Sequence, residues 1–158
     1  MDPKNLIDND SYQVFLMRCP ASIPACIGTH PWFVINKKGI LSRYEVFFGR
    51  NQGGQTLGHL HVNFYSSPFQ GLEVFPSIPG LFWKSRLIGY IEGEEARKIA
   101  EFIETTPKTY PFCEKYSLFG PNSNTYAQWV LDRSPAFKAK LPWNSFGKRD
   151  AAKIESAG

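Results

Sequence analysis

Cysteine is scarce in this sequence, and the few cysteines present show no pairing pattern. The 158 residues include Cys19, Cys26 and Cys113, an odd number with no C-x-x-C pair. Such a set builds neither a disulfide framework nor a zinc ribbon. We therefore expect reduced thiols, as in a cytoplasmic protein.

Long apolar runs are also missing. No stretch approaches the roughly 20 apolar residues that cross a bilayer. Residues 1–10 are polar and acidic, without the basic and apolar segments of an export signal. We expect no membrane span and no signal peptide, which again favours the cytoplasm.

Neither sign of charge dominates the chain. Lys and Arg number 18 against 14 for Asp and Glu, which gives a net charge of +4. Before the last twenty or so residues the basic side chains alternate with acidic ones, whereas nucleic-acid-binding proteins gather them on one face. We expect no nucleic-acid partner.

Apolar residues, in contrast, are plentiful. Hydrophobic residues make up 42% of the chain and aromatic residues 15%, enough to offset the entropy of ordering a chain of this length. The sequence therefore predicts a single α+β domain over residues 1–150, followed by a flexible tail over residues 151–158.

Short apolar or alternating segments predict an antiparallel sheet. Strands are expected at residues 12–17, 32–35, 43–48, 58–65 and 87–91. The turn Asn36-Lys37-Lys38-Gly39 joins the second and third strands as a hairpin. In the fourth strand Leu60 and Val62 face one side, while His59 and His61 face the other.

Two helices and a long loop complete the expected fold. One helix is predicted over residues 93–105, ended by Thr106-Pro107, and a second runs from Gly120-Pro121 to Ser134-Pro135. The segment Ser66–Lys84 is rich in proline, glycine and bulky apolar residues without helix or strand periodicity. We expect a loop packed by its own side chains, either a flap over a cleft or a cover for the sheet.

Three residues have the types that nucleophilic catalysis requires. Ser123 opens the second helix, where unpaired N–H groups stabilise an oxyanion. His30 precedes a strand, and Glu45 lies in the strand paired with it. A serine nucleophile needs a base, and the base needs a polar group to orient it.

Helix capping is the alternative explanation of the same residues. The run Asn122-Ser123-Asn124-Thr125 consists of preferred cap residues, and Thr125 with Gln128 matches a capping box. A histidine before a strand is commonly a hydrogen-bonded structural residue. The residues alone leave both roles open.

A metal site is a further alternative. His59 and His61 share one strand face, and with His30 they account for every histidine in the chain. Imidazole nitrogens bind zinc, and catalytic zinc sites keep a fourth position open. However, no H-x-x-E-H type motif is present, and two solvent-exposed histidines explain the pattern as well. We assign no metal and no cofactor.

Five motifs carry a resemblance to a known family. They are Gly28-Thr29-His30-Pro31-Trp32, Arg43-Tyr44-Glu45-Val46, Tyr110-Pro111-Phe112, Gly120-Pro121-Asn122-Ser123-Asn124-Thr125 and Gly147-Lys148-Arg149-Asp150. From about Tyr12 to Lys148 the chain resembles an uncharacterised bacterial family, domain of unknown function 3750. That resemblance implies no particular activity.

The order of the motifs also resembles the circularly permuted NlpC-like papain-fold hydrolases and acyltransferases. In that group a strand with the catalytic His precedes a Cys nucleophile at a helix N-terminus. By position, His30 matches the His, Ser123 the Cys and Glu45 the polar third group. The serine departs from the pattern, because a hydroxyl must lose its proton to the base during attack.

Two functions follow from this second resemblance, both with a permuted papain-like antiparallel sheet flanked by helices. The first is a hydrolase or acyltransferase acting on an amide or ester of a small-molecule, peptide or lipid-like acyl substrate, and the second is an inactive binding module with the same cleft. A His-ligated metal-dependent hydrolase remains the third. Expected substrate contacts are Asn122, Asn124, Trp32 and Tyr110.

Overall fold

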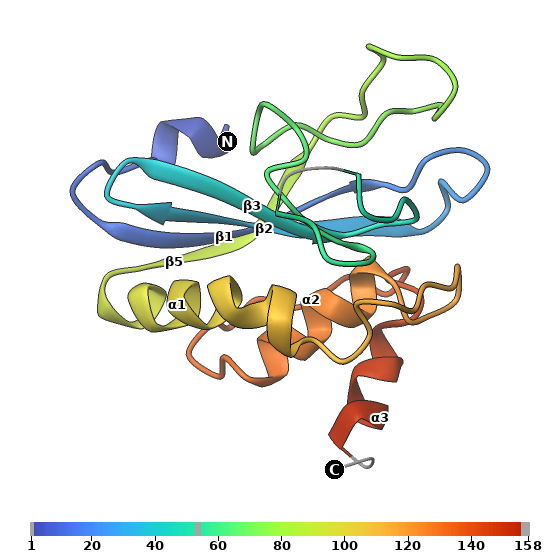
Figure 1. Ribbon diagram of the computed structural model, residues 1–158. Coiled ribbons are helices and arrows are strands. Elements are labelled where there is room, and N and C mark those ends of the chain that lie inside the picture. Colours follow the sequence, from blue (N-terminus) through green and yellow to red (C-terminus); the bar gives the residue numbers. More distant parts are fainter. Residues whose placement is uncertain (1, 53–54, 156–158) are drawn as a thin grey trace.

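The computed structural model describes residues 2–52 and 55–155. It shows a sheet with the longer helices on one face, and with loops and a short N-terminal helix on the other (Figure 1). The strands are β1 (Tyr12–Pro20), β2 (Thr29–Lys37), β3 (Ile40–Val46), β4 (Leu60–Val62) and β5 (Arg86–Glu92). They lie in the order β4-β3-β2-β1-β5, and neighbouring strands are antiparallel. The predicted α+β class and antiparallel sheet are confirmed.

The hairpin between β2 and β3 forms where the sequence predicts it. Its turn residues Lys38 and Gly39 both have positive φ, 52° and 89°, as the right-handed twist of a two-residue hairpin requires. The predicted strand over residues 58–65 is wrong in length, since β4 has three residues. Asn63 has a φ of 54°, and its side-chain oxygen accepts a hydrogen bond from the Arg43 N–H, so the regular ladder ends there.

The helices α1 (Glu94–Thr109) and α2 (Ser123–Asp132) pack on one face of the sheet. The prediction that α1 ends at Thr106-Pro107 is wrong, because Pro107 lies inside its last turn. Proline cannot donate to the carbonyl of Ile103, but the Thr106 hydroxyl donates to it instead at 2.7 Å. Among the described residues, no helix has the length and apolar character needed to cross a membrane.

Three short helices lie near the chain ends. They are η1 (Pro3–Leu6), η2 (Lys148–Ala151) and α3 (Ala152–Glu155). The segment expected as a flexible tail thus begins with a buried Ala151 and continues into α3. Residues 156–158 of that segment lie outside the described residues.

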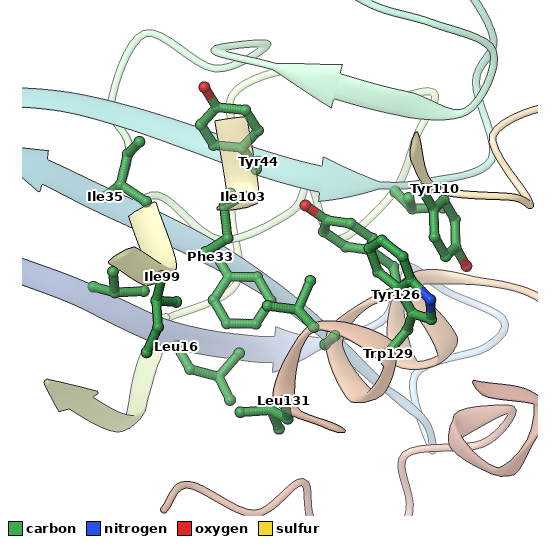
Figure 2. Packing of buried hydrophobic residues seen from close by; sticks show 14 of the residues in the cluster. Leu16, Phe33, Ile35, Tyr44, Ile99, Ile103, Tyr110, Tyr126, Trp129 and Leu131 are labelled. Carbon is green, nitrogen blue, oxygen red and sulfur yellow. The ribbon is translucent and has the colours of Figure 1, made fainter. Parts of the chain in front are cut away.

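Two hydrophobic cores fill the two faces of the sheet. The helix-face core joins the sheet to α1 and α2, and Figure 2 shows its aromatic and aliphatic side chains. Its members include Leu16, Phe33, Ile35, Ile99, Ile103, Tyr126 and Trp129. The loop-face core consists of Phe15, Met17, Cys19, Trp32, Val34, Phe69 and Leu72. Residues alternate between these cores along β1 and β2, as side chains of a strand must.

The Ser66–Lys84 segment has a buried base and an exposed tip. Phe69 and Leu72 belong to the loop-face core, whereas Ile78 and Leu81 are half exposed or more. Apart from a single bridge between Glu73 and Phe82, the segment has no strand or helix, and it projects beyond the sheet (Figure 1). The expected loop is present, and its base covers the sheet.

This division predicts different costs for two leucine substitutions in one loop. Leu72→Ala should lower the free energy of unfolding by about 2 kcal/mol or more, because it leaves a cavity in the loop-face core. The matched change Leu81→Ala, at a side chain that is 50% exposed, should cost less than about 1 kcal/mol. Urea unfolding measures both. Equal costs would contradict the assignment of a buried base and a free tip.

Candidate functional site

A buried cluster of His30, Arg43 and Glu45 lies on the loop face of the sheet. His30 Nε2 is 2.8 Å from Glu45 Oε2, and Arg43 Nη2 donates to the same oxygen at 2.7 Å. Arg43 Nε lies 2.7 Å from Oε1, although too bent for a well-directed hydrogen bond. The three side chains are at most 4% exposed. The structure therefore brings together His30 and Glu45, two of the three predicted catalytic residues.

Arg43 connects this cluster to the Ser66–Lys84 segment. Its Nη1 donates to the carbonyl of Gln70, and its guanidinium lies over the rings of Trp32 at 4.2 Å and Tyr65 at 4.7 Å. Cation–π contacts of a desolvated guanidinium are among the stronger ones. The cluster therefore fastens the base of the loop to the sheet.

Charge is distributed unevenly within the cluster. Burial alone raises the pKa of Glu45, but the charge of Arg43 and the hydrogen bonds from His30 and Arg43 outweigh it and lower that pKa to about 2. For His30, burial lowers the pKa, and the bond to Glu45 offsets this only in part. At neutral pH the cluster thus holds an ionised carboxylate, a guanidinium and a neutral imidazole.

This charge state fixes the histidine tautomer. An ionised carboxylate only accepts hydrogen bonds, so the proton of the neutral imidazole must lie on Nε2, facing Glu45. Nδ1 then carries the lone pair. Within the described residues Nδ1 has no hydrogen-bond partner, yet it is not one of the fully enclosed unpartnered atoms. His30 is therefore held as a neutral imidazole whose Nδ1 lone pair has no partner among the described residues.

Ser123 is the first residue of α2, and its neighbour caps the helix. Asn122 Oδ1 accepts from the N–H groups of Asn124 and Thr125, and the Thr125 hydroxyl accepts from the Asn122 N–H. The capping box expected from Thr125 and Gln128 is therefore wrong and lies one turn earlier. Ser123 is 4% exposed, and its hydroxyl makes no hydrogen bond to any described residue. The cap is made by the side chain of Asn122, so capping does not account for a serine at position 123.

Hydrogen bonds join the start of α2 to the start of β2. Asn124 Nδ2 donates to the Thr29 carbonyl at 2.9 Å, and the Thr29 hydroxyl donates to Asn124 Oδ1 at 3.1 Å. Thr29 precedes His30, and Asn124 follows Ser123. The two candidate residues therefore lie at the same end of the sheet.

Strand alternation, however, separates the two side chains. His30 is two residues from Trp32 of the loop-face core and shares its face, whereas α2 packs on the helix face. Within the described chain no hydrogen bond joins Ser123 to His30. The regular pairing of β2 with β3 ends at Phe33 and Tyr44, and Pro31, which follows toward His30, has no N–H to extend it.

The predicted substrate-contact residues are all buried and packed. Trp32 Nε1 donates to the Pro68 carbonyl, and the Tyr110 ring packs in the helix-face core, where Figure 2 shows it beside Tyr126. Asn122 and Asn124 both donate to the carbonyl of Phe146. All four side chains have structural contacts in this conformation.

His59, directly before β4, and His61, within it, form no metal site with other described residues. His59 Nδ1 lies 3.1 Å from the Phe47 carbonyl, and His61 Nε2 lies 2.9 Å from the Gly49 carbonyl. Both are buried, so the alternative of two solvent-exposed histidines is wrong. No group of three His, Cys, Asp or Glu residues in the described part of the chain is arranged to hold a metal ion.

Comparison with known proteins identifies the family to which the sequence belongs. The family model described as "Protein of unknown function (DUF3750)" matches residues 11–149. The chain belongs to this family. No curated protein and no solved structure shows a detectable match to it.

Arg43 is the member of the cluster that the sequence argument missed in this DUF3750 chain. It lies two residues before Glu45 and therefore on the same strand face. Two opposite charges at this spacing in a strand that also carries Tyr44 and Val46 are a signal of a buried ion pair. The residues next to Arg43 in the sequence do not indicate its role in the cluster, because the rings and carbonyls that enclose it come from β2 and the long loop.

The buried histidines His30 and His61, together with Glu45, predict that the folded protein loses stability in acid. Burial lowers the pKa of both His30 and His61, so between about pH 6.5 and these lowered values the unfolded chain binds more protons. Stability is therefore full above about pH 6.5 and falls below it, by up to about 1.4 kcal/mol per pH unit for each histidine. Glu45, lowered from 4.5 to about 2, adds a further loss below about pH 4.5.

Urea unfolding at a series of pH values between 7 and 5 measures the histidine part of this loss. His30→Gln retains a donor for Glu45 but does not titrate, so it should remove one histidine's share of the slope. His61→Gln should remove the other. A stability that stays constant from pH 7 to 5, or a slope unchanged in both variants, would contradict the neutral state of these rings.

Proposed function

We propose that this protein is a hydrolase or acyltransferase for an amide or ester bond, with Ser123 as nucleophile, His30 as base and Glu45 as the group that orients the base. The observation that carries the proposal is the bond from His30 Nε2 to an ionised carboxylate. It leaves Nδ1 neutral and without a partner in the described part of the chain, which is the state that a general base for a nucleophile requires at neutral pH.

The first turn of α2 supports the proposal independently. Of its first four N–H groups, those of Asn124 and Thr125 bind Asn122 Oδ1, and that of Tyr126 binds the Asn122 carbonyl. Within the described residues the Ser123 N–H is left without a partner. It adjoins the candidate nucleophile and suits an oxyanion.

The proposed reaction proceeds in two balanced steps. Ser123 Oγ forms a bond to the acyl carbon while its proton passes to His30 Nδ1, and the leaving amine or alcohol takes that proton as its bond to carbon breaks. Water or an acceptor alcohol or amine then gives its proton to Nδ1 and attacks the acyl carbon. The bond from that carbon to Ser123 Oγ breaks, and Ser123 takes the proton back from Nδ1, which releases the acid or the transferred acyl product. Because the two side chains lie on opposite faces in this conformation, the reaction requires a rearrangement that brings them together near the end of the β2–β3 pairing.

A binding module without catalytic activity is the second candidate. It is favoured by the enclosure of the cluster, since His30, Arg43 and Glu45 are buried beneath the long loop and Arg43 fastens that loop. In this case the cluster is a structural network that keeps its charges satisfied. The two candidates differ in whether the Ser123 position activates a nucleophile.

The substitution Ser123→Cys separates the two candidates. If the site assembles as proposed, the new thiol lies at the positive end of α2 and within reach of His30, and it should have a pKa clearly below about 8.5, the value of a free cysteine. Thiolate absorbance in the ultraviolet, followed against pH, measures this pKa even where a reagent cannot enter. Alkylation at neutral pH should also be faster than for the native cysteines, since burial raises the pKa of Cys19 to about 12 and that of Cys113 to about 11.

Two control variants remove the exposed thiol of Cys26 and the proposed base His30, one after the other. Cys26→Ser eliminates the background from the exposed native cysteine. Adding His30→Gln, which keeps a donor for Glu45, should return the pKa of the introduced thiol toward that of a free cysteine. A thiol pKa of about 8.5 or higher that does not respond to His30→Gln would exclude the hydrolase and leave the binding module.

A further inference from the structure

We propose that a basic hollow at the end of the sheet, lined by Arg18, Lys84 and Arg86, binds a phosphate group. The hollow has a volume of about 380 Å³, within the range of small-molecule sites. Thr29, Cys19 and Asn144 also line it, and no acidic residue does. The inference does not depend on the chemistry proposed for Ser123.

Two of these cations face one another across a strand pair. Arg18 of β1 and Arg86 of β5 are direct partners in the antiparallel ladder. Like charges in directly opposite positions destabilise a sheet, and β5 is an edge strand that could carry a neutral residue at this position. An anion between the two guanidinium groups would turn the repulsion into a binding interaction.

The charges of the hollow are not neutralised by the protein. In the described residues, none of Arg18, Lys84 and Arg86 forms an ion pair or a side-chain hydrogen bond. The basic residues around α1 differ in this respect: Arg97 and Lys98 each contact a glutamate of that helix. The positive charge at the hollow is therefore available to a ligand.

The residue types select the ligand chemistry. Guanidinium groups donate paired N–H bonds to the oxygens of phosphates, and a lysine adds a mobile point charge. Lys84 and Arg86 also line an adjoining hollow of about 920 Å³, beside Lys4 and Asp2. The phosphate would occupy the smaller hollow, whose charged residues are all basic, and the remainder of a phosphorylated small molecule has room in the larger one.

Thermal unfolding in sodium phosphate, compared with sodium chloride at equal ionic strength and pH 7, tests the site. Phosphate should raise the melting temperature in a saturable way, because a ligand that binds only the folded state stabilises it. Arg18→Gln and Arg86→Gln should each weaken the apparent affinity for phosphate about tenfold or more, since each removes charge-assisted hydrogen bonds. Both side chains are at least partly exposed, so the variants should fold.

The control is Lys140→Gln, which removes one charge at an exposed position that lines neither hollow. It should leave the phosphate response unchanged. A response to phosphate no larger than that to chloride, or equal losses in Lys140→Gln and Arg86→Gln, would overturn the proposal in favour of general electrostatic attraction.

A second arm distinguishes the source of the phosphate. Cosedimentation with phosphatidylglycerol vesicles, against phosphatidylcholine vesicles as reference, tests a lipid headgroup in place of a free ligand. Vesicle binding that is abolished by Arg86→Gln and competed by inorganic phosphate would assign the site to lipid phosphate. A phosphate response without vesicle binding would assign it to a soluble phosphorylated molecule.

Discussion

The buried carboxylate of Glu45 is the constraint on which the rest of the site depends. An ionised carboxylate in a protein interior requires donors and a compensating charge. Arg43 supplies both, and His30 supplies a further N–H. Removal of Arg43 would leave an unpaired buried charge, so the guanidinium, the carboxylate and the imidazole act as one unit rather than as three separate residues.

Two features of the molecule follow from this unit. The guanidinium has donors to spare after binding Glu45, and one of them holds the Gln70 carbonyl, so that the base of the long loop closes over the sheet. The carboxylate in turn fixes the proton of His30 on Nε2. The same charge therefore holds a loop and fixes the tautomer of a histidine, which is why a structural and a catalytic role are both consistent with it.

The other end of the candidate site depends on backbone satisfaction rather than on charge. Asn122 caps α2, and Asn124 joins its first turn to Thr29. With these two asparagines paired, the hydroxyl and N–H of Ser123 have no partner among the described residues at a buried helix start. Arg18 and Arg86, which have no ion-pair partner in the described part of the chain, lie at the same end of the sheet, where the hollow that they line also includes Thr29.

Local patterns in the sequence determined the strands, the β2–β3 hairpin, the two main helices and the family, because alternation, turn residues and apolar periodicity act between near neighbours. Side-chain competition decided the details: the Thr106 hydroxyl carried α1 past Pro107, and Asn63 ended β4. Only the tertiary structure decided that Arg43 joins His30 and Glu45, and that Ser123 starts from the opposite face. Those relations depend on strand register and on a loop closing over the sheet, and neither is encoded in the spacing of residues along the chain.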